Sequence, residues 1–170
     1  MGKLHTLSIE DVPSLQQIEG LASLNSLQVL ELIGFTSLER VNGLAGLEEL
    51  KTAIIQGCIK LDRLMPLSNL GKLRKLSIKD MPSLQEMEGL AGLKSLRKLM
   101  LIGCTSLERV ENLSGLEKLK TVKIQGCKKL ERMPSLSNLG KLRTLWIKDM
   151  PSLHEIDDAF GLANFTSLEE

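Results

Sequence analysis

Apolar residues recur along the chain with a period of 23 residues. They occupy positions 1, 4, 6, 9, 12, 15, 18 and 21 of each period, which in the fifth are Leu96, Leu99, Leu101, Cys104, Leu107, Val110, Leu113 and Leu116. The opening Leu-x-x-Leu-x-Leu contains the alternation of a short β-strand. The spacing of three that follows would spiral around an α-helix, because each step falls about 60° short of a full turn. It predicts 3-10 turns or irregular coil that keep pointing inward.

The 23-residue units follow one another without insertion or deletion through the first six, and the last becomes atypical from about residue 156. They begin at Leu4, Leu27, Leu50, Leu73, Leu96, Leu119 and Leu142. One unit cannot bury its apolar side, whereas stacked units can. We therefore predict a single α/β solenoid over residues 1–170. It is a curved stack of seven to eight units, with a parallel sheet on the concave side and short 3-10 or irregular segments on the convex side.

A longer period of 69 residues is superimposed on the units. LSIEDVPSL from Leu7 returns as LSIKDMPSL from Leu76 and as LWIKDMPSL from Leu145. The pattern starts at once at Leu4, without an N-terminal cap. This beginning fits either a piece of a longer solenoid or a first strand that a partner covers. An open strand edge favours edge-to-edge pairing, so homodimers through the uncapped N-terminal edge are one predicted form of association.

The motif Leu-x-x-Leu-x-Leu/Ile-x-x-Cys-x-x-Leu, repeated every 23 residues, resembles the leucine-rich repeat family over essentially the whole chain. Position 9, where many members carry Asn, holds Val12, Phe35, Cys58, Met81, Cys104, Cys127 and Met150. The phrases GCTSLERV and GCKKLERMPSL are similar to repeats of plant intracellular nucleotide-binding immune receptors. The resemblance implies one short strand per unit, a parallel concave sheet and a role in recognition.

Without Asn at position 9, the turns must satisfy their own backbone hydrogen bonds. Glycines just before that position can adopt the conformations this requires. They are Gly34, Gly57, Gly103 and Gly126.

The composition indicates a soluble protein whose core is built mainly from leucine. There are 36 Leu against three Phe, one Trp and no Tyr, and 42% of residues are hydrophobic and 25% charged, which argues against disorder. The longest apolar run, Leu99 to Ile102, is far shorter than the roughly 20 residues of a membrane helix, so no membrane association is expected. The net charge of +1 predicts no partner by itself.

The distribution of charge is more informative than its sum. Position 2 is basic through five consecutive units, and position 3 adds two lysines; together they are Lys51, Arg74, Lys75, Arg97, Lys98, Lys120 and Arg143. Such a column on the concave face predicts attraction to a protein with an acidic surface. The alternative is that these charges only keep exposed strands in solution.

Apolar residues are expected on the same face, where they can anchor a protein ligand. They are Ile33, Ile54, Met100, Ile102 and Trp146. Trp146 is the best single anchor, unless the C-terminal extension folds over it. Nucleic acid is disfavoured as a ligand, because base stacking needs aromatic side chains and this face offers only Trp146.

The three cysteines, Cys58, Cys104 and Cys127, all fall at the inward position 9 and are expected to be buried free thiols. Free thiols fit a reducing compartment and hence a cytoplasmic location. Zinc is not expected, because His5 and His154 lie far apart in the stack and no Cys-x-x-Cys occurs.

No nucleophile with a base, convergent carboxylate pair or metal set is apparent, so no enzyme activity and no cofactor are predicted. The sequence favours a non-catalytic module that binds a protein on its concave face, and the resemblance suggests immune sensing in a plant cell. Two alternatives remain open. One is a self-associating structural repeat protein, and the other is a regular scaffold without a natural ligand.

Overall fold

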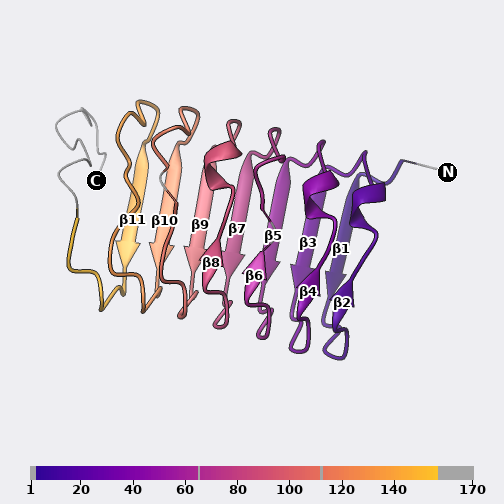
Figure 1. Ribbon diagram of the computed structural model, residues 1–170. Helices are drawn as coiled ribbons and strands as arrows, with labels where there is room; N and C mark the ends of the chain where they lie inside the picture. Colours follow the sequence, from indigo (N-terminus) through magenta and orange to yellow (C-terminus); the bar gives the residue numbers. More distant parts are fainter. Residues whose placement is uncertain (1–2, 65, 112, 157–170) are drawn as a thin grey trace.

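The computed structural model describes residues 3–64, 66–111 and 113–156. Seven long strands lie side by side in one parallel sheet, in the order in which they occur along the chain (Figure 1). They are β1 (Thr6–Glu10), β3 (Val29–Ile33), β5 (Thr52–Gln56), β7 (Lys75–Lys79), β9 (Lys98–Ile102), β10 (Thr121–Gln125) and β11 (Thr144–Lys148). Each strand pairs with the next at an offset of 23 residues, as in Thr6 with Val29 and Thr52 with Lys75. The predicted parallel solenoid is thereby confirmed.

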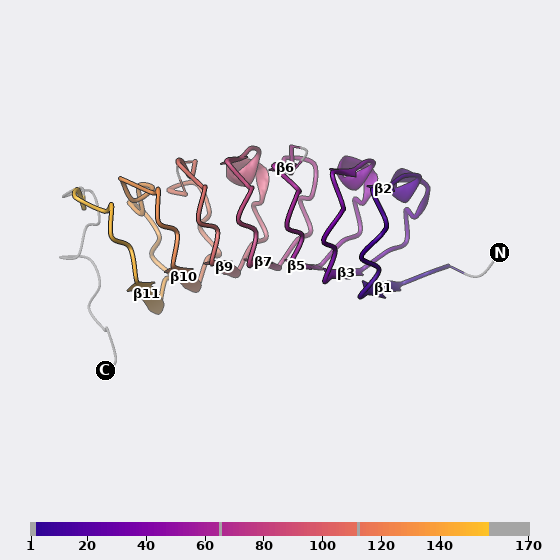
Figure 2. The same ribbon diagram turned by 90° about the horizontal axis from the view of Figure 1, so that it is seen from below.

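The opposite layer consists of short strands and single 3-10 turns (Figure 2). The short strands β2 (Gln17–Ile18) and β4 (Arg40–Val41) pair with each other, as do β6 (Arg63–Leu64) and β8 (Glu86–Met87). The turns are η1 (Leu21–Ser23), η2 (Leu44–Gly46) and η3 (Leu90–Gly92). All helical residues in the described part of the chain are of the 3-10 type, in agreement with the spacing of three.

The core lies between the two layers and is built from the repeated apolar positions. In β3, Leu30 and Leu32 are fully buried while Val29, Glu31 and Ile33 are partly exposed, which is the alternation that the strand pattern predicted. Figure 2 shows the long strands in a shallow arc, with the free face of the sheet on its hollow side. That free face is the predicted concave face.

Each long strand is followed by a turn with a left-handed residue, as expected from the glycines at this place. Gly34 has φ 78° and donates its N–H to the carbonyl of Gln56 at 2.9 Å, and Gly57 has φ 67° and donates to Lys79 at 3.0 Å. Asp11 and Asp80 take the same conformation, with φ 53° and 50°. The turns therefore use backbone hydrogen bonds between successive units in place of an asparagine side chain.

The ends of the described region are less well covered than its middle. The inward residues of β1 and β11 are only half buried, whereas those of the five strands between them are buried. No helix of the described residues combines the length and the apolar character that crossing a membrane requires. The atypical unit expected from about residue 156 lies outside the described residues.

Candidate functional site

The free face of the sheet carries three rows of side chains that point away from the core. In the middle row, neighbouring strands contribute Ser8, Glu31, Ile54, Ser77, Met100, Lys123 and Trp146. Adjacent members of a row are about 4.8 Å apart, since that is the spacing of paired strands. A ligand that lies across the strands would therefore meet several units at once.

Ser77 marks an apolar patch at the centre of this face. Its side chain points toward solvent, yet only 2% of the residue is exposed, because it lies between Ile54 and Met100 on the two neighbouring strands. Ile102 lies two residues beyond Met100 on β9, and Ile33 lies on β3, the strand next to Ile54. We call Ile33, Ile54, Met100 and Ile102 the central apolar patch. The structure places these four predicted anchors in two pairs, Ile33 with Ile54 on neighbouring strands and Met100 with Ile102 on β9. Ser77 lies between Ile54 and Met100, and Gln56 and Lys79 lie between Ile33 and Ile102.

Trp146 lies outside the central apolar patch. It is on β11, 50% exposed, and the ammonium of Lys123 on β10 lies 4.7 Å from the centre of its ring. This cation–π contact places a charge between the ring and Met100. Whether the C-terminal extension covers Trp146 concerns residues 157–170, which lie outside the described residues.

Charge is unevenly distributed along the free face. Glu10 and Glu31 lie on β1 and β3, where both accept hydrogen bonds from the Ser8 hydroxyl, at 3.0 and 3.2 Å. From β7 onward every charged outward residue of the strands is basic; these residues are Lys75, Lys79, Lys98, Lys123 and Lys148. The face is thus acidic at its N-terminal end and basic beyond its centre, and Lys75 and Lys98 lie where the sequence placed them.

The other predicted basic residues form a row at the edge of the sheet, just before the strands begin. They are Lys51, Arg74, Arg97, Lys120 and Arg143. Successive members are joined through the backbone, with the Arg74 N–H donating to Lys51 and the Arg97 N–H donating to Arg74, both at 2.8 Å. The structure therefore divides the predicted basic column between the free face and this edge.

Comparison with known proteins places the whole arrangement in a family. Residues 73–169, more than half of the chain, match the family model of the endo-beta-N-acetylglucosaminidase EndoS LRR domain. The chain belongs to the leucine-rich repeat family. No protein of curated function matches its sequence.

Several solved leucine-rich repeat structures share the fold. Internalin C2 of Listeria monocytogenes is 24% identical, with a TM-score of 0.57 over 96% of this chain and 76% of that chain. The functional domain of InlJ from the same organism, which includes a cysteine ladder, is 19% identical, with a TM-score of 0.65 over 91% of this chain and 36% of that chain. The leucine-rich repeat domain of the type III effector XopL is 18% identical, with a TM-score of 0.59 over 98% of this chain and 67% of that chain. The identities are low, and the likeness is one of fold.

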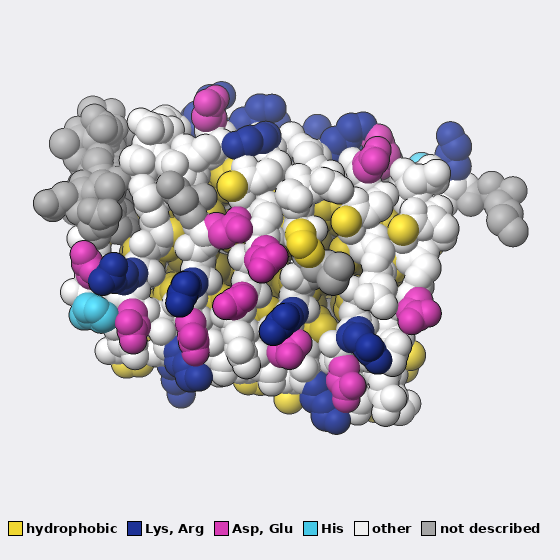
Figure 3. Space-filling model, in the orientation of Figure 1, with side chains coloured by type: hydrophobic (Ala, Val, Ile, Leu, Met, Phe, Trp, Pro, Cys, Tyr) yellow, Lys and Arg dark blue, Asp and Glu magenta, His cyan; other side chains and the backbone are white. Residues whose placement is uncertain are grey.

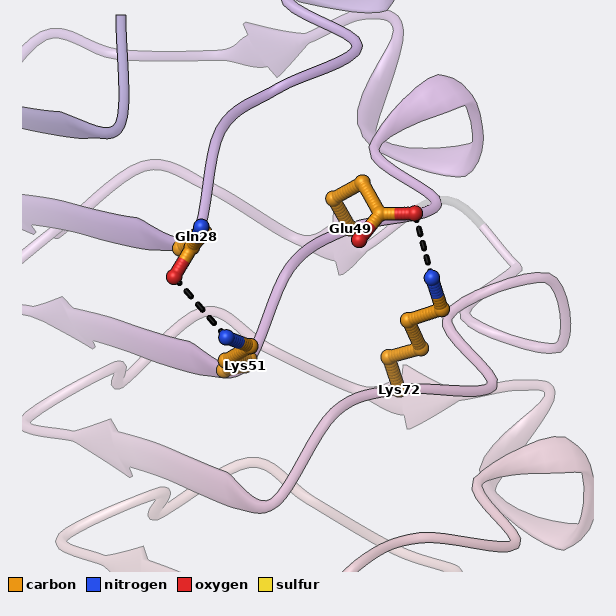
Figure 4. A network of polar contacts seen from close by, with 4 residues as sticks. All are labelled: Gln28, Glu49, Lys51 and Lys72. Atoms are coloured by element: carbon orange, nitrogen blue, oxygen red, sulfur yellow. Dashed lines mark hydrogen bonds and ion pairs between the residues drawn. The ribbon is translucent and has the colours of Figure 1, made fainter.

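In this leucine-rich repeat protein, the positive charge of the basic edge, where the long strands begin, is partly neutralised in its N-terminal half (Figure 4). Lys51 donates a hydrogen bond to the side-chain oxygen of Gln28 at 2.9 Å, and Lys72 forms an ion pair with Glu49. The hydrogen bond from Lys72 lowers the pKa of the Glu49 carboxyl. These contacts join residues of successive units, 23 positions apart.

The C-terminal half of the edge is different, because basic side chains surround a hollow of about 500 Å³. We call it the basic hollow; its lining consists of Arg97, Lys118, Lys120, Lys141 and Arg143, together with Gly140 and Leu142. Sequence reasoning found the position-2 residues among these but missed Lys118 and Lys141. The signal was present at position 23, where Lys72, Lys118 and Lys141 recur, but only the structure shows that this position borders on position 2.

The face that carries the short strands has mixed charge. Figure 3 shows acidic and basic side chains interspersed on it, while dark-blue Lys and Arg side chains gather along the upper edge, where the long strands begin. Arg132 pairs with Glu155 at 3.1 Å, and Lys129 pairs with Glu108 at 3.6 Å. Exposed pairs of this kind contribute under about 1 kcal/mol each.

All three cysteines are buried free thiols, as predicted. The Cys104 thiol lies 3.8 Å from the carbonyl of Ile102 in its own unit, and the Cys127 thiol lies 3.8 Å from the carbonyl of Leu101 in the preceding unit. Burial raises the pKa of Cys58 to about 11. Contact with the Cys127 thiol, together with burial, raises the pKa of Cys104 well above its usual range. Cys58 and Cys104 are therefore neutral core residues at neutral pH.

Within residues 3–64, 66–111 and 113–156, no group of three His, Cys, Asp or Glu side chains could hold a metal ion. His5 precedes β1 and His154 follows β11, so the two histidines lie at opposite ends of the sheet.

Proposed function

We propose that this leucine-rich repeat protein is a non-catalytic module that binds a protein ligand on the free face of its sheet. Leucine-rich repeat solenoids are typical protein–protein interaction modules, since stacked units present an extended concave surface. The observation that carries the proposal is the burial of Ser77 between Ile54 and Met100. An apolar patch surrounded by charge is the usual arrangement of the centre of a protein interface.

The charges around the patch indicate what the ligand offers. Lys75, Lys79, Lys98 and Lys123 lie on the strands that carry the patch or follow it, so the ligand is expected to bring acidic side chains to this end. Glu31 lies at the other end and disfavours an acidic contact there. The opposite charges at the two ends of the free face would fix the orientation of the ligand.

The test uses substitutions that the repeats themselves contain. Met100→Lys and Ile102→Gln give β9 the residues that β10 carries at the same places, Lys123 and Gln125, so the fold should accept them. The purified wild-type and variant chains are immobilised, and proteins retained from a lysate of the source cells are quantified by mass spectrometry. We expect a specific ligand to be lost about tenfold or more from the double variant, because the patch supplies the anchors.

The matched control is Ile59→Lys, in the turn that follows β5 and outside its outward-facing positions. Ile59 is 42% exposed, and Lys128 occupies the equivalent place three units later. This variant should retain the ligand as the wild type does. Equal retention by the wild type, the double variant and the control would overturn the assignment to the free face.

Two narrower parts of the proposal rest on the sequence. The free thiols favour a cytoplasmic location. The phrases around Cys104 and Cys127 favour immune sensing in a plant cell. Cell fractionation of the source tissue tests the first, and the identity of the retained ligand tests the second.

Self-association is the competing function, because the inward residues Leu7 and Ile9 of β1 are only half buried. Light scattering over a range of concentrations separates the two. A mass that rises with concentration would favour a self-assembling repeat protein, and a constant monomer mass would favour a ligand-binding module.

A further inference from the structure

We propose that the basic hollow is a binding site for a compact anion that carries two or three clustered phosphate groups. The hollow lies at the edge of the sheet, where β9, β10 and β11 begin, and not on the free face. The proposal therefore does not depend on the protein ligand proposed above.

The backbone holds three of the five cations at short, regular intervals. The Lys120 N–H donates to the carbonyl of Arg97 at 2.8 Å, and the Arg143 N–H donates to the carbonyl of Lys120 at 2.9 Å. These three residues therefore stand in a row with about 4.8 Å between neighbours. Lys118 and Lys141 each come two residues before a member of the row and border the same hollow. Gly140 leaves it open, since no atom lies within 4 Å of where a Cβ would be.

The chain contains its own comparison for this site, 69 residues earlier. Arg97, Lys118, Lys120, Lys141 and Arg143 correspond in turn to Gln28, Glu49, Lys51, Lys72 and Arg74. Three of the five places are basic in both copies. In the earlier copy, Gln28 accepts a hydrogen bond from Lys51 and Glu49 pairs with Lys72, as Figure 4 shows. Two substitutions thus separate a partly neutralised network from a hollow lined by cations.

The fold does not require cations at these places. Position 23 is serine in two other units, Ser26 and Ser95, and position 2 is glutamine at Gln28. In the described part of the chain, none of the five residues of the basic hollow forms an ion pair. Their positive charges repel one another, and a bound anion would relieve that repulsion.

The charge density of the hollow selects phosphate over carboxylate. A phosphate monoester carries about −1.5 to −2 at neutral pH, so two or three such groups balance five cations within one small volume. Arginine forks and lysine ammonium groups are both suited to phosphate oxygens. A hollow of about 500 Å³ has the size of a small-molecule site. Among the described residues, no aromatic side chain lines it to provide the stacking that single-stranded nucleic acid uses.

Isothermal titration calorimetry with tripolyphosphate on the full chain tests the site. We expect one binding site per chain in the wild type. The double variant Arg97→Gln, Lys118→Glu gives the hollow the residues of the earlier copy and should weaken binding about tenfold or more, because two cations are lost and a carboxylate is added. Citrate, an anion of three carboxylates, should bind more weakly than tripolyphosphate.

The reciprocal variant tests the same idea as a gain of function. Gln28→Arg with Glu49→Lys gives the earlier copy the residues of the hollow, and the number of tripolyphosphate sites per chain should rise from about one to about two. The control for net charge is Lys60→Glu with Lys128→Gln, which changes the total charge as much as the loss variant does, at two exposed residues outside the hollow. It should change the affinity by about twofold or less.

Four results would overturn the proposal. They are equal affinity for citrate and tripolyphosphate, equal weakening in the net-charge control, no second site in the reciprocal variant, and tighter binding of an oligouridine than of tripolyphosphate. The first three would reduce the hollow to general electrostatic attraction, and the last would favour a nucleic acid. None of them bears on the free face, because Met100 and Ile102 are unchanged in every variant used.

Discussion

Position 9 of the repeat accommodates several residue types. In four of the seven units this place is filled by the larger side chains Val12, Phe35, Met81 and Met150, and in the other three by a thiol. Phe35 and the cysteines are fully buried. Since backbone amides already close the turns, the residue at position 9 needs only to fill space.

Cys58 makes the stability of the chain depend on alkaline pH. Burial raises the pKa of its thiol from an ordinary value of 9.0 to about 11, so between these values the folded chain binds more protons than the unfolded chain. The contribution to stability is complete below about pH 8.5 and is lost as pH rises toward 11. Between pH 7.5 and pH 10.5, we expect the free energy of unfolding of the wild type to fall by about 2 kcal/mol more than that of Cys58→Ala, which lacks the thiol.

Urea denaturation of the two proteins under reducing conditions at both pH values measures this effect. Lysines titrate in the same range, but they are common to both chains and cancel in the difference. A difference between wild type and variant that is the same at pH 7.5 and 10.5 would show that Cys58 ionises equally easily in the folded and unfolded states.

At the scale of the element, the 3-10 turns decide how closely the units stack. Gly43 and Gly89 precede η2 and η3 with φ 87° and 83°, in the left-handed region that side chains rarely adopt. A Cβ on Gly89 would lie 2.5 Å from the backbone nitrogen of Ser68 and 2.6 Å from that of Leu67. Each glycine therefore serves both the conformation of its own turn and the approach of the preceding unit.

Gly89→Ala should destabilise the chain by more than about 2 kcal/mol. The left-handed conformation alone costs an alanine roughly 1–2 kcal/mol, and the clash is with backbone that cannot move away locally. Gly71→Ala is the control, because nothing lies within 4 Å of its Cβ position and its φ is not positive. Chemical denaturation compares the two, and similar costs at both sites would contradict the proposed packing of η3 against the preceding unit.

At the scale of the whole molecule, a leucine at the same repeat position is buried to a different extent in different units, and so contributes differently to stability. Leu99 and Leu145 occupy one position of the repeat, but Leu99 on β9 is fully buried and Leu145 on β11 only partly. Each unit of a solenoid contacts only its neighbours, so coverage from both sides decides how much apolar surface a residue removes from water.

Leu99→Ala should therefore cost about 2–5 kcal/mol, and Leu145→Ala about half as much or less. The backbone accepts alanine here, since Ala53 takes the equivalent place on β5. The free energies of unfolding of the two variants measure the difference. Equal costs would mean that β11 is packed as tightly as the centre of the sheet.

The sequence by itself determined the repeat and, within each strand, which side chains point toward the core and which point away from it. A fixed 23-residue period with apolar positions 4 and 6 suffices to predict a strand such as β9, because side chains alternate across a strand. The spacing of three suffices to predict 3-10 turns such as η3. The gathering of Ile54 and Met100 on one face also followed, since equal positions in a parallel stack form rows.

Only the tertiary structure decided which rows act together. Lys118 and Arg97 are 21 residues apart and belong to different positions of the repeat, so no periodicity brings them together. They border one hollow because the chain turns sharply before each strand, and that turn makes the end of one unit the neighbour of the start of the next. Likewise, the contact of Lys123 with Trp146 depends on side-chain conformation across two strands. Sequence periodicity defines the place of a residue within its unit, whereas a binding site depends on distances between units.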